Sequence, residues 1–303
     1  MRKILLTGVN GQVGHALQFA LANQVEVVAL SRAQLDLTRE DEIRRVISEA
    51  KPDIIINPAA YTAVDKAESE QALAYTINAT APQIIAEEAE KVNAALIHFS
   101  TDYVYDGNKT ASYTELDEVN PLGVYGKSKL AGEEAIRKVG LPHLILRTSW
   151  VYSDYGKNFL KTILRLAAER DRLRVVADQY GAPTSARSIS DGVAQLLNVW
   201  NTANSDQTGI YHFTNQGSAS WHEFACQILK DYESLSVEYH LPQLKASSNS
   251  IDAISTSEYP TPAARPINSR LDNTKLYSTF NVKLPLWQDA LITEMTSLVK
   301  SSS

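Results

Sequence analysis

A glycine-rich segment near the start of the chain places the strongest constraint on its fold. Residues 4–6 (Ile-Leu-Leu) form a short apolar run that predicts a buried strand. The glycines of Thr7–Gly14 follow, and apolar residues then recur at four-residue steps from Val13 to Leu21, as on one face of a helix. A strand, a glycine turn and a helix in this order are the setting that a dinucleotide-binding turn requires. The alternative is an ordinary strand–turn–helix that binds no ligand.

Each glycine of this turn has its own physical role. Gly8 permits the tight turn, Gly11 lets the backbone approach a pyrophosphate, and Gly14 allows the helix to pack closely on the strand. The first N–H groups of the helix and the positive end of its dipole then face the phosphates. The spacing is GxxGxxG rather than GxGxxG.

The end of the next predicted strand, Val25–Leu30, bears on the choice of cofactor. An acidic residue there binds the ribose 2′-hydroxyl of NAD, whereas an arginine suits the 2′-phosphate of NADP. This chain has Ser31 and Arg32, a hydroxyl and a guanidinium, and therefore favours NADPH, with NADH as the second choice. The alternative is that Arg32 is a solvated surface residue. Asp36 either caps a helix that starts near Arg39 or lies close to the adenine.

Composition and charge narrow the class of protein. The chain has 303 residues, of which 44% are hydrophobic and 21% charged, which is typical of a globular protein with room for two lobes. Its net charge of −6 argues against nucleic acid or an anionic membrane as a partner. No apolar run reaches the length of a transmembrane helix or a signal-peptide core. The single cysteine, Cys226, excludes an internal disulfide and fits a reducing cytoplasm.

Strands and helices alternate in the first half of the chain, which predicts a doubly wound, parallel α/β sheet of the Rossmann type. We expect residues 1–150 to form the dinucleotide-binding domain, completed by parts of 173–215, and residues 151–303 to form most of a smaller, discontinuous substrate-binding lobe. The other predicted strands are Asp53–Ile56, Ala95–Phe99 and Leu144–Arg147, and the predicted helices are Ala72–Val92 with a kink at Pro82, Asn158–Asp171, Ile189–Asn201 and Trp221–Tyr232. Residues 242–269, rich in Pro, Ser and Thr, are either a flexible linker or a substrate-facing loop, and residues 300–303 are expected to be disordered.

Tyr125 and Lys129 are the candidate catalytic pair. Asn120–Pro121 predicts a helix start and Gly140 a helix end, so the two side chains share one face of one helix. A free tyrosine has a pKa of about 10, and a lysine ammonium one turn away is expected to lower it. Thr101, at the end of a predicted strand, can hydrogen-bond a substrate carbonyl from the other side. The alternative is a surface tyrosine and lysine, because YxxxK is a common chance pattern; the glycine turn upstream favours the catalytic interpretation.

Taken together, these segments resemble the extended short-chain dehydrogenase/reductases and, within that superfamily, the family of dTDP-4-dehydrorhamnose reductases. The resemblance covers nearly the whole chain. Its pieces are Thr7–Gly14, Asn57–Glu68, Ser100–Tyr105, Val124–Glu133, Arg147–Tyr152, Asp178–Thr184, and Arg265–Pro266 ahead of Leu271–Asn273. The first and fourth mark the superfamily, and the second and third are much more specific.

The resemblance implies an NADP-dependent oxidoreductase that reduces the C4 ketone of dTDP-6-deoxy-L-lyxo-4-hexulose (dTDP-4-dehydro-6-deoxy-L-mannose) to dTDP-L-rhamnose, a precursor of bacterial cell-surface polysaccharide. It implies Thr101, Tyr125 and Lys129 as the catalytic set, with Lys129 also bound to the nicotinamide ribose. The implied cofactor-binding residues are Gly8, Asn10, Gly11, Gln12, Val13, Gly14, Ser31, Arg32, Asp36, Leu37, Ala59, Ala60, Tyr61, Asn78, Ser100, Tyr125 and Lys129. The implied substrate-binding residues are Val64, Thr101, Asp102, Tyr103 and Trp150, and Arg265 is expected to offer its guanidinium to a phosphate.

The chain departs from this family at one interface. Some members dimerise through a magnesium ion held by glutamates, and at two of those positions this chain has Ala16 and Arg187. Neither side chain offers the oxygen ligand that magnesium requires. The departure predicts no bound metal, and a monomer rather than a metal-bridged dimer.

Two other classes of protein remain open from the residues alone. One is a related nucleotide-sugar epimerase or dehydratase with the same cofactor, although a dehydratase is expected to carry a second acidic group where this chain has Tyr103 after Asp102. The other is a non-catalytic regulatory homologue. The intact set of Thr101, Tyr125 and Lys129 argues against a purely regulatory role.

Overall fold

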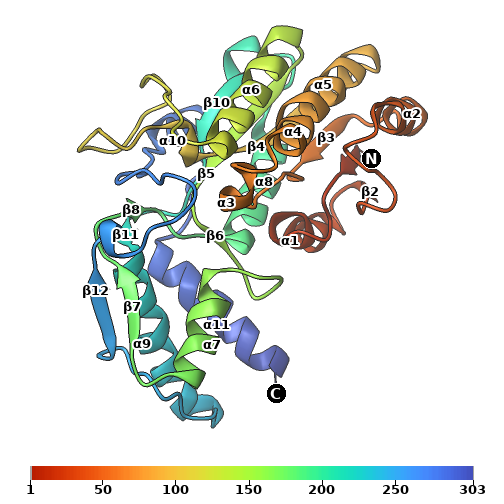
Figure 1. Cartoon of the computed structure of the whole chain (residues 1–303). Helices are drawn as coiled ribbons and strands as arrows, with labels where there is room; N and C mark the ends of the chain where they lie inside the picture. Colours follow the sequence, from red (N-terminus) through yellow and green to blue (C-terminus); the bar gives the residue numbers. More distant parts are fainter. Residues whose placement is uncertain (1, 303) are drawn as a thin grey trace.

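One parallel sheet organises the first half of the chain (Figure 1). The computed structural model describes residues 2–302, with side chains through Lys300, and within that range six strands pair in the order β10–β5–β4–β3–β1–β2. Every neighbouring pair in this sheet is parallel. The strands are β1 (Lys3–Leu6), β2 (Glu26–Ala29), β3 (Ile54–Asn57), β4 (Ala95–Thr101), β5 (His143–Thr148) and β10 (Gly209–His212). The strand order reverses between β1 and β3, where a doubly wound sheet binds its ligands.

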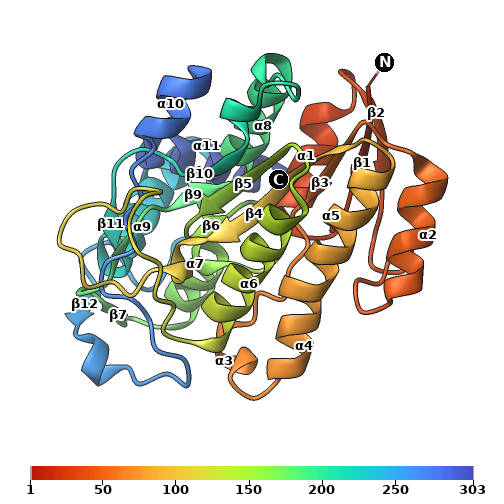
Figure 2. The ribbon, with the colours of Figure 1, turned by 90° about the horizontal axis from the view of Figure 1, so that it is seen from above.

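Alternate residues of these strands pack against helices on opposite faces of the sheet. Leu6 and Ile56 face the helices α1 and α8, whereas Leu5 and Ile55 face α2 and α5. Figure 2 shows the sheet between these two layers, with α6 beside α5. The helices are α1 (Gln12–Leu21), α2 (Glu40–Ala50), α5 (Ala81–Lys91), α6 (Val124–Val139) and α8 (Ala186–Val199). The predicted doubly wound parallel sheet is confirmed.

The helical run from residue 71 to 91 differs from the single kinked helix that the sequence predicts. It consists of α4 (Gln71–Tyr75), a π-helical turn η1 (Thr76–Thr80) and α5. Pro82 cannot donate a hydrogen bond to the carbonyl of Asn78, and that carbonyl lies against α6 at Gly132, where a Cβ would overlap it. The side chain of Asn78 is consequently fully buried between the two helices.

A second hydrophobic core forms a smaller lobe below the sheet (Figure 1). Residues from α7, α9 and α11 fill it, together with the strand pair β7 and β12. The helices are α7 (Phe159–Glu169), α9 (Trp221–Tyr239) and α11 (Trp287–Ser302), and the strands are β6 (Val151–Tyr152), β7 (Leu173–Val176), β8 (Tyr180–Gly181), β9 (Thr184–Ser185), β11 (Ala219–Ser220) and β12 (Ile251–Ile254). The remaining elements are α3 (Val64–Ala67), α10 (Thr274–Phe280) and the 3-10 turns η2 (Asp102–Val104), η3 (Ser205–Gln207) and η4 (Thr256–Glu258).

Of the two alternatives for residues 242–269, the flexible linker is wrong, because β12 within them pairs with β7 and both strands pack in the second core. Disorder of the tail is wrong as far as Ser302, which ends α11, while Ser303 lies outside the described residues. The chain also returns to the first lobe, since Tyr211 and Phe280 lie in the core of the sheet. Across residues 2–302, no helix combines the length and the apolar character needed to cross a bilayer.

Candidate active site

A cavity of about 710 Å³ opens at the carboxyl ends of the central strands, between the two lobes. The glycine turn forms one wall, the ends of β3, β4 and β5 form the floor, and Trp150 and Trp221 close the side toward the second lobe. Ligands of doubly wound sheets bind at this edge. Three basic residues line the cavity in the described part of the chain: Arg32, Lys129 and Lys157.

The glycine turn has the geometry of an anion site. Gly8 has a φ of +60°, which disfavours other residues, and a Cβ at Gly14 would overlap the Gly8 carbonyl. The Gly11 N–H donates to the Gly8 carbonyl at 2.9 Å and fixes the turn. Helix α1 then starts at Gln12, and no described side chain caps its first N–H groups. Those donors and the helix dipole are left for a phosphate.

The end of β2 presents Arg32 and Asp36 to the same cavity. Asp36 accepts hydrogen bonds from the Thr38 backbone at 2.9 Å and the Thr38 hydroxyl at 2.8 Å, which lower its pKa. Asp36 therefore stabilises a turn ahead of α2 rather than capping the helix itself. Ser31 lies outside the cavity lining, and its hydroxyl donates to Gln34 at 2.8 Å.

Tyr125 and Thr101 meet at the cavity wall. Tyr125 lies in the first turn of α6, which begins at Val124 rather than at Pro121, because the Val124 N–H donates to the Glu68 carboxylate at 2.8 Å. Both side chains line the cavity there. Desolvation raises the pKa of Tyr125 to about 12, with a further contribution from the Asp102 charge, and an interaction with Thr101 opposes the shift.

Lys129 is buried one turn further along α6. Contrary to the prediction, its ammonium does not lower the pKa of Tyr125. Its Nζ donates to the Phe99 carbonyl at 2.6 Å and lies 3.2 Å from the His98 ring. Burial lowers the pKa of Lys129 to about 8, against the attraction of Glu133. The expectation that Lys129 lowers the pKa of Tyr125 is therefore wrong for the protein without cofactor, in which the tyrosine is held in its protonated form.

Asp102 is a buried carboxylate beside this pair. It accepts hydrogen bonds from Ser149 at 2.8 Å and Thr101 at 3.0 Å. Burial raises its pKa, and hydrogen bonds from Ser269, Ser149 and Thr101 oppose the shift. Tyr103 follows and packs edge-on against Tyr125, with ring centroids 5.6 Å apart.

An aromatic wall faces these groups. Trp150 has a φ of +47°, a strained backbone conformation for a bulky residue. Its indole stacks on Trp221 with ring centroids 3.4 Å apart and an angle of 7° between the planes. On its other side lies Gly181, where a Cβ would overlap the indole. Trp221 and Gly181 thus hold Trp150 in one orientation.

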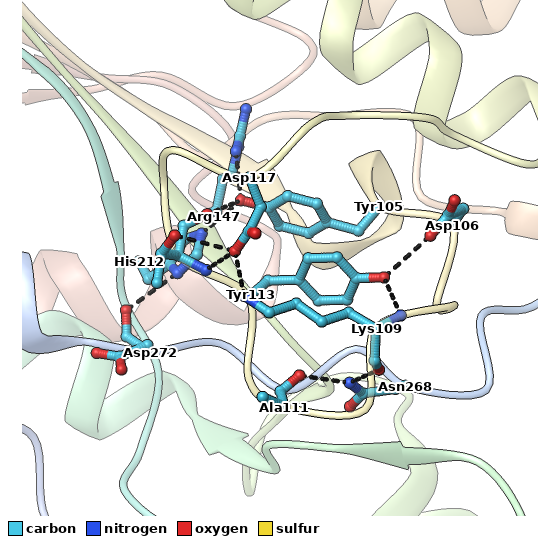
Figure 3. Close-up of polar contacts among 11 residues, drawn as sticks. Tyr105, Asp106, Lys109, Ala111, Tyr113, Asp117, Arg147, His212, Asn268 and Asp272 are labelled. Atoms are coloured by element: carbon cyan, nitrogen blue, oxygen red, sulfur yellow. Dashed lines mark hydrogen bonds and ion pairs between the residues drawn. The ribbon is translucent and has the colours of Figure 1, made fainter.

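The loop after Tyr103 is anchored from below by a buried polar cluster (Figure 3). Arg147 forms two hydrogen bonds with Glu133, at 2.9 and 2.6 Å, and donates to the Tyr105 hydroxyl at 2.7 Å. Tyr105 stacks on Tyr113, with ring centroids 4.2 Å apart. Asn268 ties the same loop to the C-terminal segment by donating to the Lys109 carbonyl at 2.6 Å. These contacts fix the floor that carries Asp102.

Most of the predicted site residues line the cavity, but three more besides Ser31 do not. Tyr61 turns its hydroxyl outward to Glu70, at 2.6 Å, and its backbone is held by the buried Asn78 at 2.8 Å. Arg265 is paired in a bidentate manner with Asp65, at 2.9 and 3.1 Å. The predicted residues that line the cavity are Gly8, Asn10, Gly11, Gln12, Val13, Gly14, Arg32, Asp36, Leu37, Ala59, Ala60, Val64, Ser100, Thr101, Asp102, Tyr103, Tyr125, Lys129 and Trp150.

Several lining residues escaped the sequence analysis. Trp221 and the segment Gly156–Asn158 reach the cavity from the second lobe, where no motif marks them. Asn158 donates to the Gln12 side chain at 2.8 Å and so joins the second lobe to the glycine turn. Thr148 was missed although it ends β5, and its buried hydroxyl has no hydrogen-bond partner among the described residues. An unpaired hydroxyl in this position suits a polar group of a ligand.

Residues 2–302 contain no group of three or more His, Cys, Asp and Glu side chains placed to hold a metal ion. The backbone N–H of Arg187 donates to the buried Glu294 at 3.2 Å, and its guanidinium reaches Ser297 at 3.3 Å. Ala16 lies in α1, which packs directly against α8, the helix that carries Arg187.

The sheet, the uncapped glycine turn and the Tyr125–Lys129 helix define an extended short-chain dehydrogenase/reductase. The family model described as "RmlD substrate binding domain" matches residues 1–299. A dTDP-4-dehydrorhamnose reductase of Burkholderia thailandensis is 44% identical over 292 residues, covering 95% of this chain and 96% of that protein. The chain belongs to this family of dTDP-4-dehydrorhamnose reductases.

Solved structures of relatives have the same fold. A dTDP-4-dehydrorhamnose reductase from Clostridium acetobutylicum superposes with a TM-score of 0.88 at 37% identity, covering 98% of this chain and 99% of that one. The Bacillus anthracis enzyme, solved in complex with NADP, also gives 0.88, at 35% identity and the same coverage.

Proposed function

We propose that this protein is an NADPH-dependent reductase that converts the C4 ketone of dTDP-6-deoxy-L-lyxo-4-hexulose to the alcohol of dTDP-L-rhamnose. The observation that carries the proposal is that Tyr125, Thr101 and Lys129 line the same cavity as the glycine turn. Family membership supports the identity of the substrate, since the relatives matched over nearly their whole length are dTDP-4-dehydrorhamnose reductases.

The cavity fits the cofactor. The uncapped start of α1 would hold the pyrophosphate, Arg32 the 2′-phosphate, and Lys129 the nicotinamide ribose. The unpaired Thr148 hydroxyl offers a hydrogen bond at the floor. When bound, NADPH supplies the hydride for the C4 carbon.

Tyr125 supplies the proton. Its raised pKa keeps the hydroxyl protonated at working pH, so the proton remains available until negative charge develops on the C4 oxygen. An alkoxide is a stronger base than a phenolate, and the transfer is therefore downhill. Thr101 orients the tyrosine hydroxyl, and the nearby Asp102 carboxylate disfavours premature loss of the proton.

The sugar would lie between this pair and the aromatic wall. Trp150, held by Trp221, presents a flat apolar surface, while Tyr103 and Val64 border the opposite side. Arg265 is already paired with Asp65 and would position the loop above the sugar nucleotide rather than provide an unpaired cation. The sheet lobe would serve the cofactor, and the second lobe, with the Thr101–Tyr103 loop, the substrate.

We further propose a cytoplasmic protein that does not form a magnesium-bridged dimer. Ala16 and Arg187 provide no oxygen ligand for the metal, and the guanidinium of Arg187 repels a cation. The net charge of −6 argues against nucleic acid as a partner. The single cysteine suits a reducing compartment, which cell fractionation tests.

The proposed function is tested by incubating the protein with NADPH and the dTDP-linked ketosugar and following NADPH absorbance. One NADPH should be lost for each dTDP-L-rhamnose formed. Lys129→Met should lose turnover and also bind NADPH more weakly, because it removes a ribose contact. Conversion of the ketosugar to an isomer without net NADPH loss would indicate an epimerase, and the absence of both sugar conversion and NADPH loss would indicate a regulatory homologue.

A further inference from the structure

A chain of buried polar side chains runs from the catalytic lysine to the first strand. Lys129 Nζ lies 3.2 Å from His98 Nε2, and His98 Nδ1 lies 3.1 Å from the side-chain amide of Asn57. The amide presents its Nδ2 to the ring, and its Oδ1 accepts a hydrogen bond from the Thr7 hydroxyl at 2.6 Å. None of these four residues is more than 2% exposed. This series of side chains extends from α6 through β4 and β3 to the end of β1, where the glycine turn begins.

The hydrogens along this chain cannot be placed independently. A lysine ammonium only donates, so His98 Nε2 must accept and the ring hydrogen must lie on Nδ1. That hydrogen needs the oxygen of the Asn57 amide opposite it, whereas the structure has Nδ2 facing the ring and Oδ1 accepting from Thr7. A charged Lys129 therefore requires the amide to be turned end for end, with its nitrogen donating to the Thr7 hydroxyl. With the amide as it stands, Nε2 carries the hydrogen, and only an uncharged Lys129 accepts it. The charge on Lys129 is therefore coupled to the tautomer of His98 and the orientation of Asn57.

We propose that His98 is a positioning residue that holds the Lys129 ammonium through its Nε2 acceptor, with the Asn57 amide turned so that its oxygen accepts from Nδ1 and the Thr7 hydroxyl accepts from its nitrogen. Two of the three Nζ hydrogens are then committed, to His98 and to the Phe99 carbonyl. The third is left for the cavity that Lys129 lines. The inference rests on the proposed function only in taking that third donor as the ribose contact.

The other groups around Lys129 leave this role to His98. Glu133, on the same helix, attracts Lys129, but its carboxylate is already engaged by Arg147 at 2.9 and 2.6 Å and by Ser100. From β4, the Phe99 carbonyl and His98 face the ammonium. Burial and the Lys129 charge lower the pKa of His98 well below its usual value, so the ring stays neutral and able to accept.

Two substitutions of His98 distinguish the loss of its hydrogen-bond acceptor from the loss of its imidazole ring. His98→Gln places an amide oxygen near the position of Nε2 and can still accept from Lys129. His98→Asn reaches Asn57 but is too short for the lysine. We expect His98→Asn to weaken NADPH binding by about tenfold, the lower end of the loss of a hydrogen bond to a charged group, and His98→Gln to stay within about threefold of the wild type.

The pH dependence of NADPH binding, measured by fluorescence titration without sugar, gives a readout that a purely structural role would not move. Binding should weaken as pH rises through about 8, where Lys129 loses its charge. Without the His98 acceptor the Lys129 ammonium is less stable relative to the amine. In His98→Asn the pH at which NADPH binding weakens should therefore fall by roughly one unit. This pH should stay the same in His98→Gln. An unchanged value in a folded His98→Asn would overturn the proposal.

Nitrogen NMR of the wild-type His98 ring provides a test that needs no variant. At neutral pH the hydrogen should be on Nδ1, and a hydrogen on Nε2 would contradict the proposal even if His98→Asn fails to fold. Neither measurement uses the ketosugar. If NADPH binding and the tautomer behave as expected while no sugar is reduced, the proposed function is wrong and the role of His98 stands.

Discussion

The two halves of the cavity are built in different ways. The cofactor half is contiguous in sequence: the donors of the glycine turn are backbone groups of residues 8–14, and Arg32 lies in the loop just after the next strand, β2. The substrate half is assembled from distant segments, because Thr101, Trp150 and Trp221 meet only through the packing of the second lobe on the sheet.

This difference predicts how each half responds to change. In the cofactor half we propose that backbone N–H groups bind the phosphates, so a side-chain substitution should alter the choice of dinucleotide without changing the affinity for the sugar nucleotide. In the substrate half each surface is held by a neighbour, as Trp150 is held by Trp221 and Gly181. A substitution of a residue that supports the aromatic wall should therefore change the affinity for the sugar nucleotide and leave the affinity for the cofactor unchanged.

The largest effect is expected where the halves meet. Tyr125→Phe removes only the transferable proton and should lower kcat by about 10²–10⁴-fold, the usual contribution of a general acid. The NADPH dissociation constant should stay within about twofold, because no charge is lost. Tyr277→Phe, at a half-exposed tyrosine of α10 far from the cavity lining, is the matched control. A Tyr125→Phe enzyme with near-wild-type turnover would remove Tyr125 from the mechanism.

Arg32→Asp tests whether a side chain of the cofactor half sets the choice between NADPH and NADH. The Michaelis constant for NADPH should rise by about 10–100-fold, the scale of a lost hydrogen bond between charged groups, while that for NADH stays equal or falls. Arg45→Asp makes the same charge change on α2, outside the cavity, and should leave both constants alone. Equal effects on the two cofactors would show that Arg32 does not recognise the 2′-phosphate.

A smaller effect is expected from the aromatic wall. Trp221→Leu removes the ring that stacks on Trp150 and should raise the Michaelis constant for the sugar nucleotide by roughly two- to tenfold, the scale of an aromatic pair. NADPH affinity should not change. Trp200→Leu, in the core of the sheet lobe, should lower stability and spare the sugar constant. A loss of NADPH affinity in Trp221→Leu would break the separation between the halves.

The smallest effect concerns metal. Because Ala16 and Arg187 offer no oxygen ligand, EDTA should leave both the activity and the mass in light scattering unchanged. A dimer that dissociates on chelation, and re-forms with magnesium, would show that other side chains compensate for these two residues.

The sequence predicts the glycine turn better than the wall that the second lobe contributes, for a physical reason. The roles of Gly8 and Gly14 follow from backbone geometry alone. At both positions a Cβ would overlap neighbouring backbone atoms. The contribution of Trp221 depends on a contact between segments 71 residues apart, for which no local pattern exists. The strand β12 was missed because its pairing with β7 is likewise a long-range feature.

The pKa of Tyr125 shows a second limit of sequence reasoning. Helical spacing places Lys129 one turn away, but it does not reveal where the ammonium points. In the structure the lysine turns to Phe99 and His98, and desolvation of the tyrosine prevails. Spacing along a helix gives the neighbours of a group, whereas its protonation depends on burial and on hydrogen bonds from other elements.

Transfer of deuterium tests the central claim most directly. NADPH in which both C4 hydrogens of the nicotinamide are deuterium would be incubated with the ketosugar nucleotide, and the product analysed by NMR. The account predicts dTDP-L-rhamnose that carries deuterium at C4 of the sugar, in an amount equal to the NADPH consumed, and far slower formation of this product with Tyr125→Phe. Product without deuterium at C4, or labelled product from Tyr125→Phe at the wild-type rate, would contradict it.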